Sequence, residues 1–383
     1  MNLTKDNKIH VLYLVSRLRR VGPGFQLYNI IKHLDRDKFV PHIITLSPER
    51  KVSLIDSFRS IDVPCNSIGL SSIAGMIFGA KKINKLLQHN PADLIHASDY
   101  RSILLCARNF GHLPRVVTCR QAFDYNHYSM DGIFNPISAR VIVTTLEMAC
   151  RKCERIVGVS DFVRCSAGNE LAKRMMVIYN GVDQDVFRPP DKEEKAALRS
   201  KLNLPCDKHI FLSVGFLSKR KDPVTIIKAF LRHKLDKTAV LVFLGDGSLY
   251  HECQRLAHMN HNIRFVGFVQ NVRDYLGASD TFISASLTEG CPNAIMEALA
   301  CGLPVILSDI PPHREILTFD ERAGRLFPVK NVAALSDILS EVAGMDNSEH
   351  SVSALSIIKN HLNARAMSLK YQKLYAELKD SIG

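Results

Sequence analysis

Residues 281–304 read TFISASLTEGCPNAIMEALACGLP, and this stretch gives the strongest signal in the chain. It begins with a β-branched and aromatic run that predicts a strand over 281–285. A helix is expected to start at about Pro292, because proline suits the first helical turn, and to stop at Gly302, because glycine suits the position just after a helix. A buried strand followed directly by a helix is the repeating unit of a parallel sheet.

Short apolar runs alternate with helical patterns along the whole chain. Strands that are apolar along their length are typical of parallel sheets covered by helices on both faces. The first half holds the expected strands Ile9–Val15, Val40–Leu46, Asp93–His96, Arg115–Cys119, Ile156–Val159 and Met176–Tyr179. The second half holds Ile210–Val214, Ala239–Leu244, Ile263–Val266, Thr281–Ala285, Pro304–Leu307 and Arg325–Phe327. The expected fold class is therefore α/β, with two doubly wound parallel-sheet (Rossmann-like) lobes that face a cleft.

A linker is expected in the middle of the chain. Two prolines, Pro189 and Pro190, and the charged residues after them interrupt the strand pattern. We expect an N-terminal lobe over 1–188 and a C-terminal lobe over 189–365. A last helix over 366–383 is expected to cross back to the N-terminal lobe.

The composition excludes several classes of protein. Of the 383 residues, 46% are hydrophobic and 23% are charged, which is ordinary for a soluble globular protein and unlike a disordered or collagenous chain. The apolar runs fall far short of the roughly 20 residues that a membrane span needs. The first ten residues are polar and lack the pattern of a signal peptide. We expect a cytoplasmic protein, and association with the inner face of the cell membrane stays open.

Positive charge is concentrated in the first half of the chain. Residues 1–190 hold 26 Lys and Arg against 16 Asp and Glu, whereas the remainder holds 24 against 22. This asymmetry favours an anionic partner for the first half, such as a phosphorylated substrate or a membrane surface. The segment 73–87 has apolar residues at helical spacing with lysines beside them, so it suits either an anionic membrane or core packing with a solvated lysine face. Nucleic acid is not an expected partner, because Trp is absent and no nucleic-acid-binding motif is present.

A glycine-containing turn follows the first expected strand. Gly22 and Gly24 stand where the chain passes from the strand to a helix, so backbone N–H groups there can approach an anion. A nicotinamide cofactor fits poorly, because the third glycine of GxGxxG would fall at Leu27. A plain tight turn is the alternative.

The ten cysteines do not predict a metal site. Cys150 and Cys153 form a CxxC pair, but no second pair stands at the spacing of a zinc site. Reduced, buried thiols are the better interpretation. We expect neither a metal nor another cofactor.

The helix after Pro292 has the features of an anion site. Its free N–H groups near Asn293 and Ala294 can hold a diphosphate. Glu297 lies further along the same apolar helix, where a carboxylate needs a polar partner. That partner is either a pair of ribose hydroxyls or the cation of a buried salt bridge.

The pattern SxxEGxPNxxxEAxAxGxP in this stretch resembles that of the family-4 retaining glycosyltransferases of the two-lobed GT-B architecture. The likeness extends over most of the chain, through Val159-Ser160, Tyr179–Asp183 with Phe187, Ser213–Gly215 through Lys221, Leu244–Gly247, Val266–Val269, Ala278–Asp280 and Glu315. It implies transfer of a sugar from a nucleotide diphosphate-sugar, expected to be a UDP-sugar, without an obligatory metal. The implied acceptor is a sugar hydroxyl of a glycan or of a lipid-diphosphate-linked glycan in the biosynthesis of bacterial lipopolysaccharide or capsule.

The resemblance also implies the catalytic residues and the donor site. Glu289 would grip the donor sugar, Lys221 would neutralise the departing diphosphate, and Glu297 would bind the ribose. A solvated basic run over 219–221 is the alternative for Lys221. The expected donor-binding residues are Gly22, Gly24, Gly215, Phe216, Lys221, Val269, Glu289, Gly290, Cys291, Pro292, Asn293, Ala294 and Glu297.

Two positions depart from the family pattern. Phe216 stands where the family usually has an arginine that clamps the diphosphate, so Lys219 or Arg220 are candidates for the missing charge. Arg120 ends a strand where the family often has histidine; it cannot act as a base because it stays protonated, but it can bind a phosphate. The expected acceptor-binding residues are His96, Asp99, Arg120 and Asp124, and for His96 a structural role is the alternative. Other basic residues that would add to an anionic acceptor site are Arg17, Arg19, Arg20, Arg101 and Arg108.

Two other functions stay open at this point. A nucleotide-sugar epimerase of the same fold would convert a free UDP-sugar without an acceptor. A non-catalytic nucleotide-sugar-binding protein would bind the donor tightly and transfer nothing, and the two departures from the family pattern make this alternative reasonable.

Overall fold

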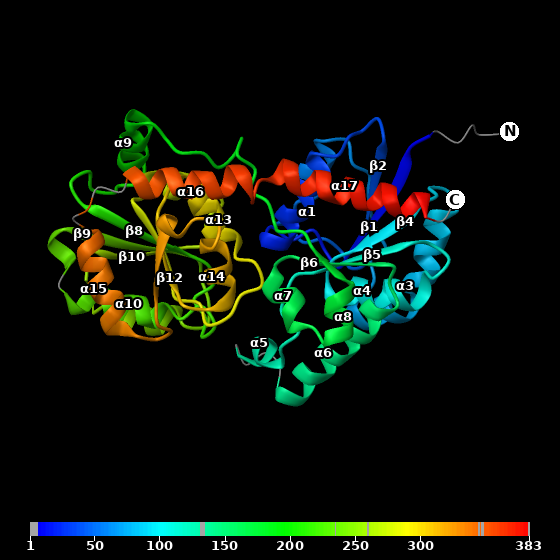
Figure 1. The fold of residues 1–383 in the computed structure, drawn as a ribbon, viewed down its shortest axis with the longest axis horizontal. Coiled ribbons are helices and arrows are strands. Elements are labelled where there is room, and N and C mark those ends of the chain that lie inside the picture. The colour runs from blue at the N-terminus through cyan, green and yellow to red at the C-terminus, as the bar shows by residue number, and fades with distance from the viewer. Residues whose placement is uncertain are drawn as a thin grey trace. The chain divides into compact units, whose positions relative to one another are not determined.

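The chain forms two compact units, which Figure 1 shows in a computed structural model. The structure describes residues 7–130, 135–233, 235–258, 260–343, 345 and 348–381. Unit 1 contains the described residues of Met1–Asn126, Asn135–Gly181 and Ala364–Gly383, and unit 2 contains those of His127–Phe134 and Val182–Asn363.

Unit 1 is built on a seven-stranded sheet with the strand order β3-β2-β1-β4-β5-β6-β7. All neighbouring strands are parallel, and Tyr13 in β1 pairs with Ile43 of β2 on one side and His96 of β4 on the other. The strands are β1 (Ile9–Val15), β2 (Phe39–Thr45), β3 (Cys65–Ser67), β4 (Leu94–Ala97), β5 (Arg115–Cys119), β6 (Arg155–Gly158) and β7 (Met175–Val177).

Helices cover the sheet of unit 1. Helix α1 packs against α17, and α4 packs against both α3 and α6. The bounds are α1 (Gly22–Lys32), α2 (Ile55–Arg59), α3 (Ser72–Leu87), α4 (Tyr100–Asn109), α6 (Pro136–Arg151), α7 (Asp161–Ser166), α8 (Asn169–Arg174) and α17 (Ala364–Asp380). Helix α5 (Tyr125–Ser129) begins in unit 1, and its residues from His127 onward are grouped with unit 2.

The last helix, α17, completes the core of unit 1. Its residues Tyr371 and Tyr375 are buried in one apolar cluster with Val11 and Tyr13 of β1 and Ile30 of α1. The hydroxyl of Ser368 donates a hydrogen bond of 2.7 Å to the carbonyl of Ile30. The two ends of the chain therefore share one core.

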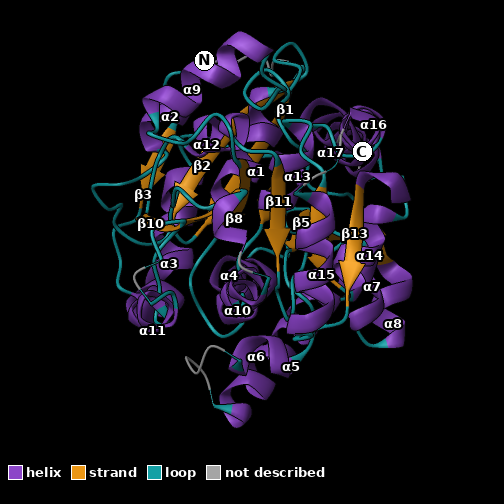
Figure 2. Cartoon of the chain, turned by 90° about the vertical axis from the view of Figure 1, so that its left-hand side faces the viewer, coloured by secondary structure: helices purple, strands orange, loops and turns teal. Residues whose placement is uncertain are grey.

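Unit 2 is built on a six-stranded parallel sheet with the strand order β10-β9-β8-β11-β12-β13. The strands are β8 (His209–Val214), β9 (Ala239–Leu244), β10 (Ile263–Gly267), β11 (Thr281–Ser284), β12 (Val305–Ser308) and β13 (Gly324–Phe327). The helices are α9 (Lys192–Lys201), α10 (Pro223–Arg232), α11 (Tyr250–Leu256), α12 (Val272–Ala278), α13 (Asn293–Ala300), α14 (Pro311–Leu317), α15 (Val332–Val342) and α16 (Ser348–Asn360). Figures 1 and 2 show strands flanked by helices, with α10 and α15 on one face of this sheet and α13 and α16 on the other.

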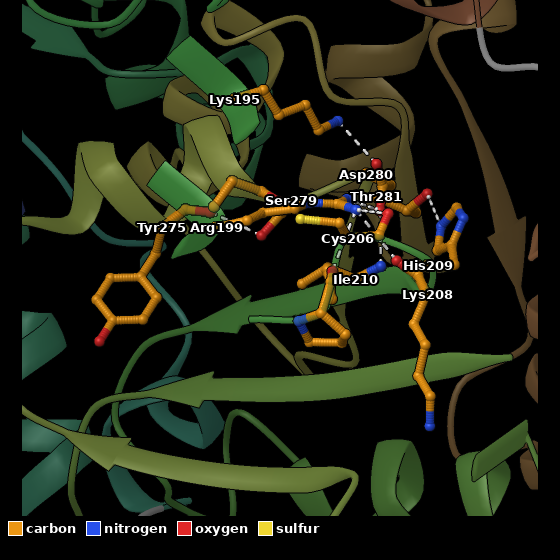
Figure 3. A network of polar contacts seen from close by, with 12 residues as sticks. Lys195, Arg199, Cys206, Lys208, His209, Ile210, Tyr275, Ser279, Asp280 and Thr281 are labelled. Atoms are coloured by element: carbon orange, nitrogen blue, oxygen red, sulfur yellow. Dashed lines mark hydrogen bonds and ion pairs between the residues drawn. The ribbon is translucent and has the colours of Figure 1, made fainter. Parts of the chain in front are cut away.

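A buried polar network anchors α9 to the amino ends of β8 and β11 (Figure 3). The carboxylate of Asp280 accepts hydrogen bonds from Lys195 Nζ at 2.7 Å, Arg199 Nη2 at 2.5 Å and the backbone N–H of Ile210 at 2.7 Å. Arg199 also donates to the backbone carbonyl of Ala278 at 3.0 Å. The network lies at the start of the strands, and ligands of parallel sheets bind at the opposite edge.

The expected fold class of two doubly wound parallel sheets is confirmed. Each expected strand is present with small shifts at its ends, and β3 is the strand that the sequence did not predict. Apart from the short segment His127–Phe134, which is grouped with unit 2, the chain passes from unit 1 to unit 2 after Gly181, ahead of the proline pair, and returns after Asn363. Close to these two passages, the N–H of Val182 donates to the carbonyl of Leu362 at 2.8 Å.

Candidate functional site

Each sheet reverses its strand order beside its first strand. Strand β1 lies between β2 and β4, and β8 lies between β9 and β11. In open α/β sheets, ligands bind beyond the carboxyl ends of the strands at such a reversal. The candidate sites are therefore the loops after β1 and β4 in unit 1 and the loops after β8 and β11 in unit 2.

In unit 2, two glycines bring the ends of β8 and β9 together. Gly215 has φ 149° and Gly245 has φ 129°, values that side chains disfavour. A Cβ on Gly245 would lie 2.0 Å from the carbonyl oxygen of Gly215, so no larger residue fits there. The N–H of Leu217 also donates to the carbonyl of Asp246 at 3.1 Å. These contacts fix the path of the loop that leads to Lys221.

The loop after β8 is joined to the loop after β11. The N–H of Leu287 donates to the carbonyl of Arg220 at 2.8 Å, and Arg220 Nη1 donates to the carbonyl of Thr288 at 3.2 Å. A small pocket lies at this junction. Its lining residues are Ser213, Val214, Gly215, Phe216, Leu217, Lys221, Pro223, Phe243, Ser284 and Ser286.

Glu289 holds two cations at this pocket. Its buried carboxylate forms an ion pair with Lys221, accepts from Arg220 Nη1 at 3.3 Å, and accepts from the hydroxyl of Ser286 at 2.9 Å. Burial alone would raise the pKa of Glu289, but the charges of Lys221 and Arg220 lower it to about 2. The carboxylate is therefore charged at neutral pH, and it holds two positive charges, of which Lys221 lines the small pocket.

The helix after this loop begins where the sequence predicts. Helix α13 starts at Asn293, and Pro292 at its N-cap provides no side-chain hydrogen bond to the first turn. Cys291, Asn293 and Ala294 are partly exposed, whereas Gly290 is buried. The first turn of α13 can therefore offer backbone N–H groups to an anion.

Glu297 lies on the same helix and is partly buried. No hydrogen bond or ion pair reaches its carboxyl group from the part of the chain that the structure describes. Burial raises the pKa of Glu297 to about 8. A partly buried carboxyl group without a protein partner is the kind of group that hydroxyls of a ligand can satisfy.

The remaining donor candidates do not all gather here. Phe216 is 58% exposed at the rim of the pocket, and Val269 follows β10 in the same unit. Gly22 and Gly24 belong to unit 1, at the start of α1. A Cβ on Gly24 would lie 2.1 Å from the carbonyl oxygen of Arg19, so Gly24 has a packing reason to be glycine.

In unit 1, His96 is part of the core. Its Nδ1 lies 2.7 Å from the hydroxyl of Tyr375 and its Nε2 lies 2.7 Å from the hydroxyl of Thr118. Its ring also stacks on Tyr371, with 5.2 Å between the ring centroids. Burial, and then the charge of Arg120, lower the pKa of His96 to about 3, so the ring is neutral. Both ring nitrogens of His96 are hydrogen-bonded to other side chains of the protein. This favours a structural role for His96 over a contact with an acceptor.

Asp99, Arg120 and Asp124 lie in loops at the carboxyl ends of β4 and β5. Asp99 caps α4 and accepts hydrogen bonds of 2.5 Å from both the N–H and the hydroxyl of Ser16, so it ties β1 to β4. Arg120 donates to the side chain of Asn180 at 3.5 Å. Asp124 is partly exposed, just before α5.

Sequence reasoning left the roles of three residues of these sites undecided or unrecognised. Arg220 was one of two candidates for the missing charge, and its contact with Glu289 distinguishes it from Lys219, which is exposed. Ser286 opens the recognised pattern, but its bond to Glu289 depends on a turn that the pattern alone does not show. Ser47, fully buried after β2, carried no signal at all.

Two absences apply to the part of the chain that the structure describes. No group of three or more His, Cys, Asp or Glu side chains there could hold a metal ion. Among the same residues, no helix is both long and apolar enough to cross a membrane.

Two family models match the chain. The model described as Glycosyltransferase Family 4 matches residues 22–186, and the model described as Glycosyl transferases group 1 matches residues 194–354. Together they span most of both units.

Curated relatives carry related names. An Escherichia coli UDP-Gal:alpha-D-GlcNAc-diphosphoundecaprenol alpha-1,3-galactosyltransferase is 28% identical, over 67% of this chain and 68% of that protein. The O-antigen biosynthesis glycosyltransferase WclY of Escherichia coli is 23% identical, over 96% of this chain and 98% of that protein.

Among solved structures, Anabaena Alr3699/HepE in complex with UDP has the same fold. It superposes with a TM-score of 0.77 at 17% identity, over 96% of this chain and 100% of that chain.

Proposed function

The chain belongs to the family-4 glycosyltransferases of the GT-B type, and we propose that it transfers a sugar from a UDP-sugar to a hydroxyl of a lipid-diphosphate-linked glycan, with retention at the anomeric carbon. UDP is favoured because HepE was crystallised with it and because the named galactosyltransferase uses UDP-Gal. The acceptor class is taken from the diphosphoundecaprenol in the name of the same relative.

One observation carries the donor half of the proposal. Lys221 and Arg220 converge on the buried carboxylate of Glu289 at the point where the sheet of unit 2 reverses its order. A UDP-sugar placed there would set its diphosphate against these two cations and the first turn of α13. Its ribose hydroxyls would donate to Glu297, and its sugar would contact Glu289. We also propose Gly215, Phe216, Val269 and Gly290–Ala294 as the walls of this donor site.

The chemical step needs little from the protein beyond charge and position. The bond between the anomeric carbon and the diphosphate oxygen breaks, and the acceptor oxygen bonds to the same face of that carbon. The acceptor proton passes to the departing diphosphate. The leaving diphosphate gains negative charge as its bond breaks, so Lys221 and Arg220 stabilise the transition state more than the bound donor.

A thermal-shift panel of nucleotides and nucleotide sugars tests donor binding. A ligand at 100 times its dissociation constant adds about 2.7 kcal/mol to the free energy of unfolding. We expect stabilisation by UDP and one or more UDP-sugars, and none in the Lys221→Ala variant at the same concentration. A panel without any stabilising nucleotide would contradict the proposal. Conversion of a UDP-sugar in the absence of acceptor would favour an epimerase instead.

We also propose that unit 1 contacts an anionic membrane through α3 and α6. Helix α3 exposes Ile73, Ile77 and Phe78, and its next turns carry the exposed lysines 81, 82 and 85. Helix α6 exposes Ile137, Val141 and Met148 along one side. Exposed apolar side chains next to lysines suit the boundary between lipid tails and anionic headgroups.

Co-sedimentation with vesicles tests this contact. Wild type should pellet with vesicles that contain phosphatidylglycerol more than with neutral ones, and Ile73→Ser with Ile77→Ser should reduce the bound fraction severalfold. Val352→Ser is the matched control, because Val352 is an exposed apolar residue on α16 of unit 2. Equal pelleting of all proteins would rule out a contact through α3.

A further inference from the structure

Two arginines lie side by side at the strand reversal of unit 1. Arg17 follows β1 directly, and Arg101 lies in the first turn of α4, just after β4. Arg17 Nε donates to the carbonyl of Pro48 at 3.0 Å, and Arg101 Nη1 donates to the hydroxyl of Ser47 at 3.0 Å. Because both side chains are anchored to neighbouring residues after β2, both guanidinium groups occupy the same corner of the sheet edge.

The surroundings hold Arg101 in one position. Ser47 is fully buried, so its hydroxyl is a fixed acceptor for Arg101. On its other side, the guanidinium of Arg101 packs against Gly75 of α3. A Cβ at this position would lie 2.9 Å from Arg101 Nη2, so a larger residue would crowd the guanidinium. Burial lowers the pKa of Arg101, the charge of Asp99 opposes this effect, and the positive charge of Arg17 adds a smaller lowering. The protein therefore keeps two like charges close together, beside the carboxylate of Asp99, in a partly desolvated place where a phosphate can contact both guanidinium groups.

The nearby carboxylates have other hydrogen-bond donors. Asp99 accepts from the N–H and the hydroxyl of Ser16 at 2.5 Å each. Glu49 accepts from the N–H of Leu18 at 3.0 Å and from the hydroxyl of Ser53 at 2.7 Å. Both carboxylates thus fix the loops around the arginine pair, and Arg17 forms no ion pair within the described residues.

The position of this pair separates it from the other basic residues of unit 1. Arg20 lies over the ring of Phe25, 5.8 Å from its centroid, and Arg108 is exposed near the end of α4. Arg19 is exposed in the same loop as Arg17, whereas the side chains of Arg17 and Arg101 are both anchored to the residues after β2, at the strands where the order reverses. A ligand is expected at that place in an open α/β sheet.

We propose that Arg17 and Arg101 form the subsite for the diphosphate of a lipid-linked acceptor. Paired guanidinium groups match phosphate oxygens with several charge-assisted hydrogen bonds, and two positive charges match the charge of a diphosphate bridge. The inference rests on the proposed glycosyl transfer, and it adds that the enzyme recognises the anionic bridge of the acceptor in addition to its sugar.

Binding of geranyl diphosphate in the presence of saturating UDP tests the subsite, because UDP then occupies the donor site. By isothermal titration calorimetry, wild type should bind this probe and should not bind geraniol, which lacks the diphosphate. Arg17→Gln and Arg101→Gln should each weaken binding about tenfold or more, since a hydrogen bond to a charged group contributes about 1.5 to 3 kcal/mol. The affinity of Arg101→Lys for geranyl diphosphate should lie between those of Arg101→Gln and wild type, because lysine keeps the positive charge but lacks the planar, bidentate guanidinium group.

Arg108→Gln is the matched control, because it removes an exposed arginine from the same helix, and it should bind as wild type does. Unaltered binding in the Arg17 and Arg101 variants, an equal loss in Arg108→Gln, or no binding by wild type would overturn the subsite. A loss of UDP affinity in the Arg17 or Arg101 variants would also overturn it, since the pair would then serve the donor. Failure of wild type to bind UDP would instead contradict the proposed function.

Discussion

Lys221 and Glu289 form an ion pair that joins the loop after β8 to the loop after β11. The two residues are far apart in sequence, yet both stand at the carboxyl ends of adjacent central strands. Because Glu289 is buried and charged, it fixes the ammonium group of Lys221 before any ligand arrives. A cation fixed in advance stabilises a developing negative charge without reorganisation during the reaction.

Replacing Lys221 with alanine should therefore lower kcat about 100- to 1000-fold, as is typical when one preorganised charge or donor is lost. The measurement is the initial rate of sugar transfer at saturating donor. Lys219→Ala is the control, because Lys219 is exposed two residues away. A Lys221→Ala enzyme with wild-type kcat would remove Lys221 from the mechanism.

Arg220 should supply the second positive charge at the diphosphate, which the resembled family obtains from an arginine at the position of Phe216. Its guanidinium contacts Glu289 at 3.3 Å beside Lys221, so Arg220→Gln should lower kcat/KM for the donor about tenfold or more. Adding Phe216→Arg to this variant should restore part of the activity, because it returns an arginine to the position where the resembled family has one. No effect of Arg220→Gln, together with a loss in Lys219→Gln, would assign the charge to Lys219.

UDP binding should release a proton near pH 7. Glu297 has a pKa of about 8, so it is largely protonated in the free protein at pH 7. Two ribose hydroxyls that donate to it favour the carboxylate and lower this pKa. Calorimetric titrations in buffers of different ionisation enthalpy measure the number of protons released. Glu297→Gln should abolish the release, and an unchanged release in that variant would place the proton elsewhere.

Acidification should destabilise unit 1 through His96. The pKa of His96 is about 3 in the folded protein, below the ordinary value of 6.5. The unfolded chain therefore binds the proton first as the pH falls, so the free energy of unfolding drops from about pH 6.5 downward and continues to drop toward pH 3. Urea unfolding at pH 7 and pH 5 should show a smaller drop for His96→Gln than for wild type. His209 and His313, with pKa values of about 4, act in the same direction in unit 2.

Asp280→Asn should reduce stability without changing the chemistry. Burial would raise the pKa of Asp280, but Lys195, the N–H of Ile210 and Arg199 lower it, so the carboxylate is charged. Removing the charge of Asp280 leaves Lys195 and Arg199 without a carboxylate partner. Breaking a buried ion pair in this way typically lowers the free energy of unfolding by about 3 to 5 kcal/mol. Urea unfolding measures the loss. The UDP affinity of the folded variant should equal that of wild type, because the network lies at the amino ends of the strands (Figure 3).

The sequence predicted the parts of the fold that depend on local pattern. Apolar strands and the proline and glycine at the ends of α13 are local signals, and both sheets follow from them. Strand β3 was not predicted, because it is three residues long and reads Cys-Asn-Ser, so it lacks the apolar run that is typical of a strand. Its pairing with β2 comes from the tertiary structure.

The candidate site was only partly predictable for a similar reason. Lys221, Glu289 and Glu297 stand in recognisable patterns, but the choice between Lys219 and Arg220 needed the geometry of the loop. The role of His96 depends on Tyr375, 279 residues away in sequence. No local pattern contains a partner at that separation.

The position of Tyr371 and Tyr375 in the core of unit 1 has a consequence for biosynthesis. On the ribosome, the first strand emerges early, but the helix that seals it is translated only after all of unit 2. The nascent amino-terminal half must therefore wait, with part of its apolar interior uncovered, while the other half is made. Chaperone demand should be greatest in that interval, and a stop codon just before residue 364 should yield insoluble product.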